Sequence, residues 1–411
     1  MTPQIKQRIE QIRCGEVPEG YKKTKVGIVP NEWKETTVDK CVIEYVEKTT
    51  VENQYPVLTS ARSGLMLQSE YYSNNQVTTN DNVGYNVLPR GYVTYRSRSD
   101  DGRFRFNENQ IIDRGIISYF YPVFSFKTNV SHNFMLCLLN HTIYRQSYSF
   151  VEGTAQQVLS FKKLGSLKYC LPSLPEQQEI AEILSAQDKL IALKEKLIEE
   201  KKRQKKALMQ QLLTGKKRLP GFSGEWVDVK LGDIFAERVE TSCQGLELLS
   251  VTGINGVVPR STIETKDNSS EDKSKYLKIC KGDIGYNTMR MWQGVSALSD
   301  YEGIVSPAYT ILVPSEKISA KYFSYLFKMH AVIFLFYRFS QGIVDDTRSL
   351  KYHEFAKLHL NVPSDKCEQE AIAEILTVSD KELEILQKDL DQEKQKKKAL
   401  MQLLLTGIVR V

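Results

Sequence analysis

The sequence predicts an α+β protein made of two repeated halves, each a mixed domain of strands and helices followed by one long helix. Three observations support this prediction: a 36-residue segment occurs twice, apolar residues recur every seven positions in both copies, and short strand-like segments cluster in the stretch before each copy. The copies are 180–215 and 372–407, and they align without a gap at 19 identical positions. A duplication of this length in a chain of 411 residues indicates two equivalent units rather than one large domain.

Each copy is expected to form one long helix that pairs in a coiled coil. The first would run from Glu176 to Thr214, 39 residues or about 58 Å, with Pro175 in a tolerated position at its start and Gly215 at its end. Apolar residues spaced by seven predict the seam, and they are Ile183, Leu190 and Leu197 beside Leu184, Ile191 and Ile198, with Leu376, Leu383 and Leu390 in the second copy. The lysine runs 201–206 and 394–398 are expected on solvated helix faces, or beside a nucleic-acid backbone.

The order of segments predicts a circular organisation with an approximate two-fold axis. Residues Ile5–Gly15 look like the end of such a helix, placed before the first domain as 206–215 is placed before the second. We therefore expect antiparallel long helices and a short N-terminal helix, residues 3–15, beside the C-terminal one. The boundaries predicted are 1–170 for the first domain, 171–219 for the first spacer helix, 220–362 for the second domain and 363–411 for the second spacer helix.

Within the domains, strands are predicted at 91–95, 115–126 and 310–313, and helices at 131–139 and 320–338. The strands cluster and no long helix separates them, which favours an α+β domain over an alternating βαβ fold.

Composition indicates a globular cytoplasmic protein. Hydrophobic residues make up 41% and charged residues 26%. The seven cysteines include no CxxC pair, so we expect neither a disulfide framework nor a zinc ribbon, as is typical of a reducing compartment. The most apolar stretch, 322–339, contains Lys328, His330 and Arg338, which predicts a buried helix rather than a membrane span. No membrane partner is expected.

No motif in the sequence indicates catalysis. There is no GxGxxG fingerprint, no GxxxxGK[ST] loop, no Asn/Asp-Pro-Pro-aromatic tetrapeptide, no Pro-Asp…(Asp/Glu)-x-Lys cluster and no metal-ligand spacing among the five histidines. We therefore expect no catalytic, metal-binding or cofactor-binding residue in this chain.

One polar stretch in each half is a candidate nucleic-acid contact. Residues 95–106 alternate arginines with small polar residues and phenylalanines, which would place several arginines on one face of a hairpin. Arginine grips guanine and phosphate with two parallel hydrogen bonds. The candidates are Arg96, Arg98, Arg103 and Arg105 in the first half, and Asn287, Arg290, Trp292 and Arg348 in the second. A solvated hairpin with no ligand remains the alternative. The loops 153–156 and 342–348 are further candidates for backbone contacts.

The charge is unevenly distributed. Residues 1–219 hold 32 basic and 23 acidic side chains, whereas residues 220–411 hold 24 and 27. The net charges are therefore +9 and −3, which favours nucleic-acid binding by the first half and leaves the second dependent on local patches or on a partner's charge.

The duplicated helices carry a family resemblance. Pro172, Glu176-Gln177, Ile180-Ala181 and the closing Leu-Thr-Gly are repeated in the second copy, where Pro363 and Glu368 lie one residue further apart and Ala371 replaces Glu179. Over essentially its whole length the chain resembles the specificity subunit of type I restriction–modification systems.

This resemblance implies a set of partners. Each domain would read one half of a split, asymmetric site in double-stranded DNA, and the helices would set the spacing. The same helices would dock two modification subunits that carry S-adenosylmethionine and methylate adenine. Restriction subunits, with ATP, Mg²⁺ and nuclease activity, would join that complex.

Two other interpretations compete with this one. A coiled-coil scaffold with two ligand-binding heads and no DNA role would explain the helices, but not why they stay alike while the heads diverge. A free-standing methyltransferase is opposed by the missing tetrapeptide.

Overall fold

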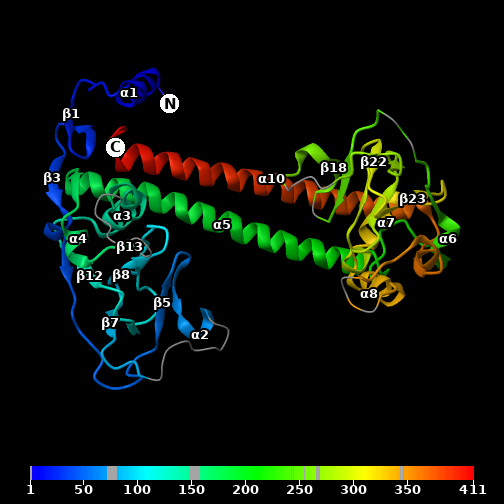
Figure 1. The fold of residues 1–411 in the computed structure, drawn as a ribbon, viewed down its shortest axis with the longest axis horizontal. Coiled ribbons are helices and arrows are strands. Elements are labelled where there is room, and N and C mark those ends of the chain that lie inside the picture. Colours follow the sequence, from blue (N-terminus) through cyan, green and yellow to red (C-terminus); the bar gives the residue numbers. More distant parts are fainter. Residues whose placement is uncertain are drawn as a thin grey trace. The chain divides into compact units, whose positions relative to one another are not determined.

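The computed structural model describes residues 2–411 except 72–80, 148–156, 242, 244, 254, 265–268, 343, 345 and 346, and only the backbone of 144–147. The chain divides into two compact units, Met1–Leu193 with Leu390–Val411, and Lys194–Asp389. Two long helices, α5 (Leu174–Leu212) and α10 (Lys366–Leu405), each contribute residues to both units (Figure 1).

The first unit is a mixed domain around a four-stranded antiparallel sheet in the order β10-β8-β12-β4. Among the described residues, the same unit also contains the two-stranded pairs β1–β2, β5–β6, β7–β11, β9–β13 and β3–β14. Its elements are α1 (Pro3–Arg13), β1 (Tyr21–Thr24), β2 (Gly27–Pro30), β3 (Lys34–Thr37), η1 (Val38–Lys40), β4 (Val42–Glu44), β5 (Leu58–Ala61), β6 (Gly64–Leu67), α2 (Gln68–Tyr71), β7 (Asn86–Pro89), β8 (Val93–Tyr95), β9 (Arg98–Ser99), β10 (Phe106–Glu108), β11 (Arg114–Ile117), β12 (Val123–Phe126), α3 (His132–Ser147), β13 (Gln157–Val158), α4 (Phe161–Gly165) and β14 (Lys168–Leu171).

The second unit has its own four-stranded antiparallel sheet, in the order β21-β20-β23-β16. The surrounding pairs are β17–β18, β19–β22 and β15–β24. Its elements are β15 (Trp226–Lys230), α6 (Leu231–Ile234), β16 (Phe235–Glu237), β17 (Leu249–Thr252), β18 (Gly256–Pro259), η2 (Arg260–Thr262), β19 (Leu277–Ile279), β20 (Ile284–Asn287), η3 (Met291–Gln293), β21 (Ser296–Leu298), β22 (Gly303–Val305), β23 (Tyr309–Pro314), α7 (Ala320–Leu326), α8 (His330–Phe339), α9 (Tyr352–Phe355) and β24 (His359–Pro363).

The two sheets have the same topology. Reading from one edge, β10, β8, β12 and β4 of the first unit correspond to β21, β20, β23 and β16 of the second. The register corresponds as well, because Tyr95 faces Phe106 in one unit and Tyr286 faces Ser296 in the other. The predicted α+β class with two repeated domains and two long helices is confirmed.

The core of each unit is completed by both long helices. In the first unit Ile180 and Leu184 of α5 share a core with Phe134 and Leu138 of α3 and with Leu404 of α10. In the second unit the roles are exchanged, since Leu212 of α5 and Ile372 and Leu376 of α10 line the core. Burial of these side chains, at about 1.5–3 kcal/mol each, fixes the helices to the domains.

The repeated Glu-Gln pairs fasten the helix ends. The Glu176 carboxylate accepts two hydrogen bonds from Arg410, at 2.8 and 2.9 Å, and Glu368 accepts two from Arg218 at 2.7 Å. The adjacent Gln177 accepts from the Ser131 N–H just before α3 and donates to the Pro172 carbonyl. Gln369 makes the same two bonds to Ser319 and Pro363. In each unit the glutamine of the motif therefore provides a hydrogen-bond acceptor for a backbone N–H at the start of a helix in the mixed domain, here called the head.

The long helices pair in an antiparallel sense within each unit. In the second unit ion pairs join the helices, and residue numbers rise along α5 as they fall along α10. The pairs are Lys194 with Asp389, Lys201 with Glu382 and Lys205 with Asp380. In the first unit Gln187 donates to Glu393, and Lys397 pairs with Asp188. Lys201, Lys205 and Lys397 of the two basic runs thus pair with carboxylates of the other helix. The remaining lysines of the runs are exposed, as expected for solvated faces: Lys202, Lys206, Lys394, Lys396 and Lys398.

Only one of the two predicted heptad series forms the seam of α5. Leu184, Ile191 and Ile198 are buried, at 0%, 9% and 3% exposure. Ile183, Leu190 and Leu197 are 36–43% exposed, so their assignment to the seam was wrong. Neighbouring residues lie 100° apart around a helix, and a narrow two-helix seam buries only one of two adjacent series.

The N-terminal segment lies beside the end of α10 within the first unit. Arg8 donates to the Ile408 carbonyl, and the Tyr21 hydroxyl donates to the Gly407 carbonyl at 3.0 Å. The expectation that the short N-terminal helix lies next to the C-terminal helix is confirmed.

Three predicted elements have different bounds. The strand at 115–126 is two strands, β11 and β12, of different sheets, because a turn at Ser118–Tyr121 precedes Pro122. The helix at 320–338 is divided into α7 and α8, since Lys328 turns inward to donate to two carbonyls. The helix at 131–139 continues to Ser147. Among the described residues, no helix combines the length and apolarity needed to cross a membrane.

Candidate nucleic-acid interface

The arginine-rich stretch of the first unit connects β8 to β10. Its side chains alternate as predicted: Arg103 and Arg105 are exposed, whereas Phe104 and Phe106 are buried in the core of the unit. The stretch is not a simple hairpin, however, because β9 leaves the sheet and pairs antiparallel with β13. The two phenylalanines therefore anchor the segment in the core of the unit, and the two arginines lie on its surface.

All four predicted arginines of this unit line one cavity of about 570 Å³. Arg96, Arg98, Arg103 and Arg105 come from the connection itself, and Arg62 joins them from the turn between β5 and β6. The sequence analysis missed Arg62. Its signal was a short polar turn, Arg62-Ser63, between two apolar strands.

Asp101 organises part of this cavity. It pairs with Arg62 at 2.6 Å and with Arg103 at 3.9 Å, and it accepts hydrogen bonds from the Ser99 hydroxyl and the Arg103 N–H. The backbone hydrogen bond from Arg103 is the main cause that lowers the pKa of Asp101, with further contributions from Ser99 and Arg62. The carboxylate therefore stays charged and sets the positions of two arginines.

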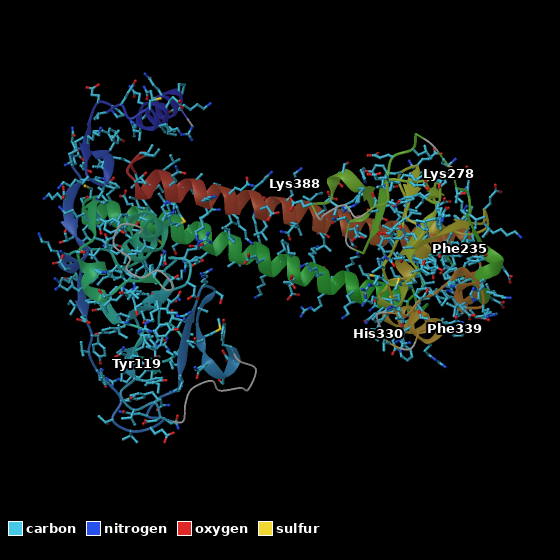
Figure 2. The ribbon with its side chains drawn as sticks, viewed as in Figure 1. Tyr119, Phe235, Lys278, His330, Phe339 and Lys388 are labelled. Carbon is cyan, nitrogen blue, oxygen red and sulfur yellow. The ribbon has the colours of Figure 1, made fainter. Side chains whose placement is uncertain are left out.

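Arg98 is held by an aromatic ring. Its guanidinium carbon lies 4.1 Å from the centroid of Phe120, whose ring in turn packs against Tyr119 with centroids 4.1 Å apart. Figure 2 shows Tyr119 in this head of the molecule. Stacking restrains the plane of the guanidinium and leaves its N–H groups at the edge.

In the second unit the corresponding connection, between β20 and β21, is a compact turn. Asn287 ends β20, and its side-chain oxygen accepts from the Met289 N–H at 3.0 Å. Trp292 lies in η3 and donates its indole N–H to the Met289 carbonyl at 2.9 Å. Arg290 is exposed in the same turn. Three of the four predicted residues of this unit thus belong to one turn.

The fourth residue joins this turn through a tyrosine that the sequence analysis missed. The Arg348 guanidinium carbon lies 4.1 Å from the Tyr337 ring centroid, and the Tyr337 and Trp292 centroids are 6.0 Å apart. Tyr337 belongs to α8, whose end residues His330 and Phe339 are labelled in Figure 2. Helical periodicity places Tyr337 on a different face of α8 from the buried Val332 and Phe336, and this could have identified it as a surface residue.

Equivalent polar side chains hold the strand that follows each connection. Asn140 of α3 bonds to both the N–H and the carbonyl of Phe106. Lys328 donates to the carbonyls of Gly294 and Ser296, at 2.7 and 2.6 Å. Burial lowers the pKa of Lys328 to about 8. In each unit, a side chain from the helical segment that packs on the sheet thus holds the end of the connection through hydrogen bonds to its backbone.

The predicted loop 153–156 lies outside the described residues, as do residues 343, 345 and 346 of the loop 342–348. In the described part of the chain, no three His, Cys, Asp or Glu side chains converge as they would around a metal ion.

The family of the chain follows from its two repeats. The family model for the type I restriction modification DNA specificity domain matches twice, over residues 34–203 and 223–394. The chain belongs to this family. Each match contains one head and the part of a long helix that follows it, so the specificity domain corresponds to the repeated unit.

One relative of this specificity-domain chain matches nearly its full length, and another matches about two thirds of it. A protein of Methanocaldococcus jannaschii, assigned as the MjaX specificity subunit of a type I restriction enzyme, is 23% identical over 96% of this chain and 97% of its own. The type I restriction enzyme MjaVIII specificity subunit of the same organism is 27% identical over 64% of this chain and 67% of its own.

Solved structures support the fold. The S subunit of a type I restriction–modification system from M. genitalium has a TM-score of 0.54 at 14% identity, over 90% of this chain and 96% of its own. A chain from a study of complex assembly and conformational transition in the type I R-M system also has 0.54, at 13% identity, over 93% and 99%. Membership of the specificity family supports a role in DNA recognition.

Proposed function

We propose that this chain recognises a split, asymmetric site in double-stranded DNA and directs adenine methylation and restriction by partner subunits. Each head would read one half-site, and the two long helices would fix the spacing. The chain itself would catalyse neither reaction.

One observation carries this proposal. The two heads share one topology and one set of attachments to the long helices, yet the connections at equivalent places carry different side chains. The first offers arginines around a cavity, and the second offers a tyrosine that contacts both a tryptophan and an arginine. A duplicated scaffold with divergent contact residues suits a site whose halves differ in sequence.

We propose that a modification subunit docks on α5. Ile183, Ala186, Leu190, Leu193 and Leu197 form an apolar stripe at alternating spacings of three and four, and all five are exposed, Leu193 to 66%. This spacing is typical of a coiled-coil contact, and the stripe lies about 120° around α5 from the residues that pack against α10. The stripe therefore suits a coiled-coil contact with a helix of a modification subunit. At the equivalent places α10 has Ile375, Val378, Glu382, Ile385 and Asp389.

The cofactors would belong to the partners. Modification subunits would supply S-adenosylmethionine, and restriction subunits would supply ATP and Mg²⁺. The contacts of this chain would bind and orient the DNA for them, which includes leaving the target adenine accessible for extraction from the duplex.

The test is the methylation pattern directed by this chain. The full chain would be produced with a modification subunit in cells that lack adenine methylation, and modified adenines would be mapped across the genome. We expect one split motif with an unread spacer and two unlike halves, and no methylation when this chain is omitted. Methylation without any split motif, or an equal pattern without this chain, would contradict the proposal and favour a scaffold role.

A further inference from the structure

We propose that Arg98 reads a guanine in the half-site of the first head, whereas Arg96 and Arg105 contact phosphates. This inference rests on the function proposed above and names the residue that decides one base. The distinction depends on how each arginine is held, since all of them line the same cavity.

The backbone around Arg98 is fixed on both sides. Ser97 donates its N–H and its hydroxyl to the Phe120 carbonyl, at 3.0 and 2.7 Å, and its own carbonyl accepts from the Leu159 N–H. Arg98 itself pairs with Val158 in β9–β13. The following turn contains Gly102 at φ +72, which packs so closely against Gln157 that a Cβ there would collide with it. The backbone of this segment is therefore held in one conformation by hydrogen bonds and packing on both sides of Arg98.

The side chain of Arg98 is fixed as well. The Phe120 ring lies beneath its guanidinium at 4.1 Å, and no ion pair of Arg98 occurs among the described residues. An arginine restrained in this way loses less rotamer freedom on binding than an unrestrained one. Stacking occupies the face of the guanidinium but leaves its paired N–H donors available at the edge.

The remaining arginines of the cavity are held differently. Arg62 and Arg103 share the Asp101 carboxylate, so part of their charge is already compensated. Arg96 and Arg105 are exposed and have no ring contact in the described part of the chain. Long, unrestrained cations suit phosphates, where contact strength depends on charge more than on geometry.

The chemistry of Arg98 selects guanine. A planar guanidinium donates two parallel hydrogen bonds to the O6 and N7 acceptors that guanine presents in the major groove. Adenine has a donor in place of O6, so one arginine N–H would face an N–H group. A lysine keeps the charge but lacks the planar pair of donors, so Arg98→Lys separates base reading from simple attraction.

The experiment uses the full chain assembled with its modification subunits. The recognised site is first determined with the unaltered chain. Methylation of duplexes carrying each base at every position of both half-sites is then compared for Arg98→Ala, Arg98→Lys, Arg96→Ala and Arg105→Ala. We expect both Arg98 variants to lose about 10- to 100-fold of the preference for guanine at one position of one half-site. The Arg96 and Arg105 variants should weaken binding at every sequence and lower the dependence of binding on salt.

The second half-site is the internal control. Unchanged reading there shows that a variant is folded and assembled. A first half-site without guanine, or an unchanged guanine preference in both Arg98 variants, would overturn the assignment of Arg98. A preference retained by Arg98→Lys would also overturn it, because charge alone would then suffice. If the unaltered chain selects no motif, the proposed function fails instead, so the two failures are distinguishable.

Discussion

Single residues at the helix ends explain why the repeat is so well preserved between the two halves. Glu176 and Glu368 are nearly inaccessible, and each is neutralised by an arginine that follows the end of the other long helix. The hydrogen bonds that Arg410 donates to Glu176 and Glu32 raise the pKa of Arg410. Sequence comparison reveals these glutamates but not Arg218 and Arg410 as their partners, since the partners lie 150 and 234 residues away.

The first prediction concerns the more deeply buried of these two pairs. Arg218→Ala leaves Glu368, whose side chain is 1% exposed, without its guanidinium. We expect a loss of about 3 kcal/mol in unfolding free energy, the low end for breaking a buried pair, because Arg218 itself is 31% exposed. Urea unfolding measures it. Lys202→Ala, which breaks a surface pair with Glu199, should change stability by less than about 1 kcal/mol. Equal losses in both variants would contradict this account.

The second prediction concerns Lys328 and pH. Its pKa is about 8 in the folded chain and about 10.4 in an unfolded one. Between these values the unfolded state holds the proton and the folded state does not, so Lys328 makes stability rise with pH over this interval. Below pH 8 both states are protonated and the dependence ends.

Melting temperatures of the unaltered chain and of Lys328→Met, measured from pH 7 to pH 10, test this effect. The melting temperature of the unaltered chain minus that of Lys328→Met should increase with pH above pH 8 and should stay constant below pH 8. A constant difference over the whole range would show that Lys328 does not titrate there.

At the scale of elements, the long helices were predictable and the short ones were not. Repetition, heptad spacing and terminal glycines predicted α5 to within two residues at each end, and α10 lies inside the predicted spacer 363–411. Gly215 and Gly407 end the helices in the left-handed conformation, at φ +70 and +72. By contrast, the break between α7 and α8 depends on two carbonyls that Lys328 reaches across the unit, which no local pattern contains.

The exposed stripe of α5 gives the third prediction. Leu193→Asp should leave the melting temperature nearly unchanged, because Leu193 is 66% exposed, but should prevent stable assembly with a modification subunit. Size-exclusion chromatography of the mixed subunits measures assembly. Ala192→Asp is the matched control, since it is exposed on the same helix about 130° from the centre of the stripe. Assembly that survives Leu193→Asp would exclude this stripe as the docking surface.

At the scale of the whole molecule, the sequence was informative where the halves are alike and poor where they differ. The equal topology of the two sheets is hidden by divergence, apart from a shared glycine and tyrosine before each connection. The fold also brings Arg62 to the same cavity from the turn between β5 and β6, and Phe120 to Arg98 from the turn between β11 and β12. Such contacts depend on tertiary structure, and residues chosen from a single stretch cannot include them.

The uneven charge of the chain leads to the last prediction. The first domain, residues 1–170, carries +5 and the second, residues 220–362, carries −1, and two equivalent modification subunits would add the same charge at both half-sites. Binding to a short duplex with only the first half-site should therefore weaken more steeply with salt than binding to one with only the second. The slopes of log K against log salt concentration, measured with the assembled complex, compare them directly. Equal slopes would mean that the partners, not this chain, determine the electrostatic contacts.

The sharing of α10 between the cores also has a consequence for synthesis on the ribosome. The second unit is one continuous stretch, Lys194–Asp389, whereas the first unit needs Leu404 and Leu405 to close its core. Domains of a growing chain fold once all their residues have emerged. We therefore expect the first unit, although it is translated earlier, to complete its folding only after α10 has been made.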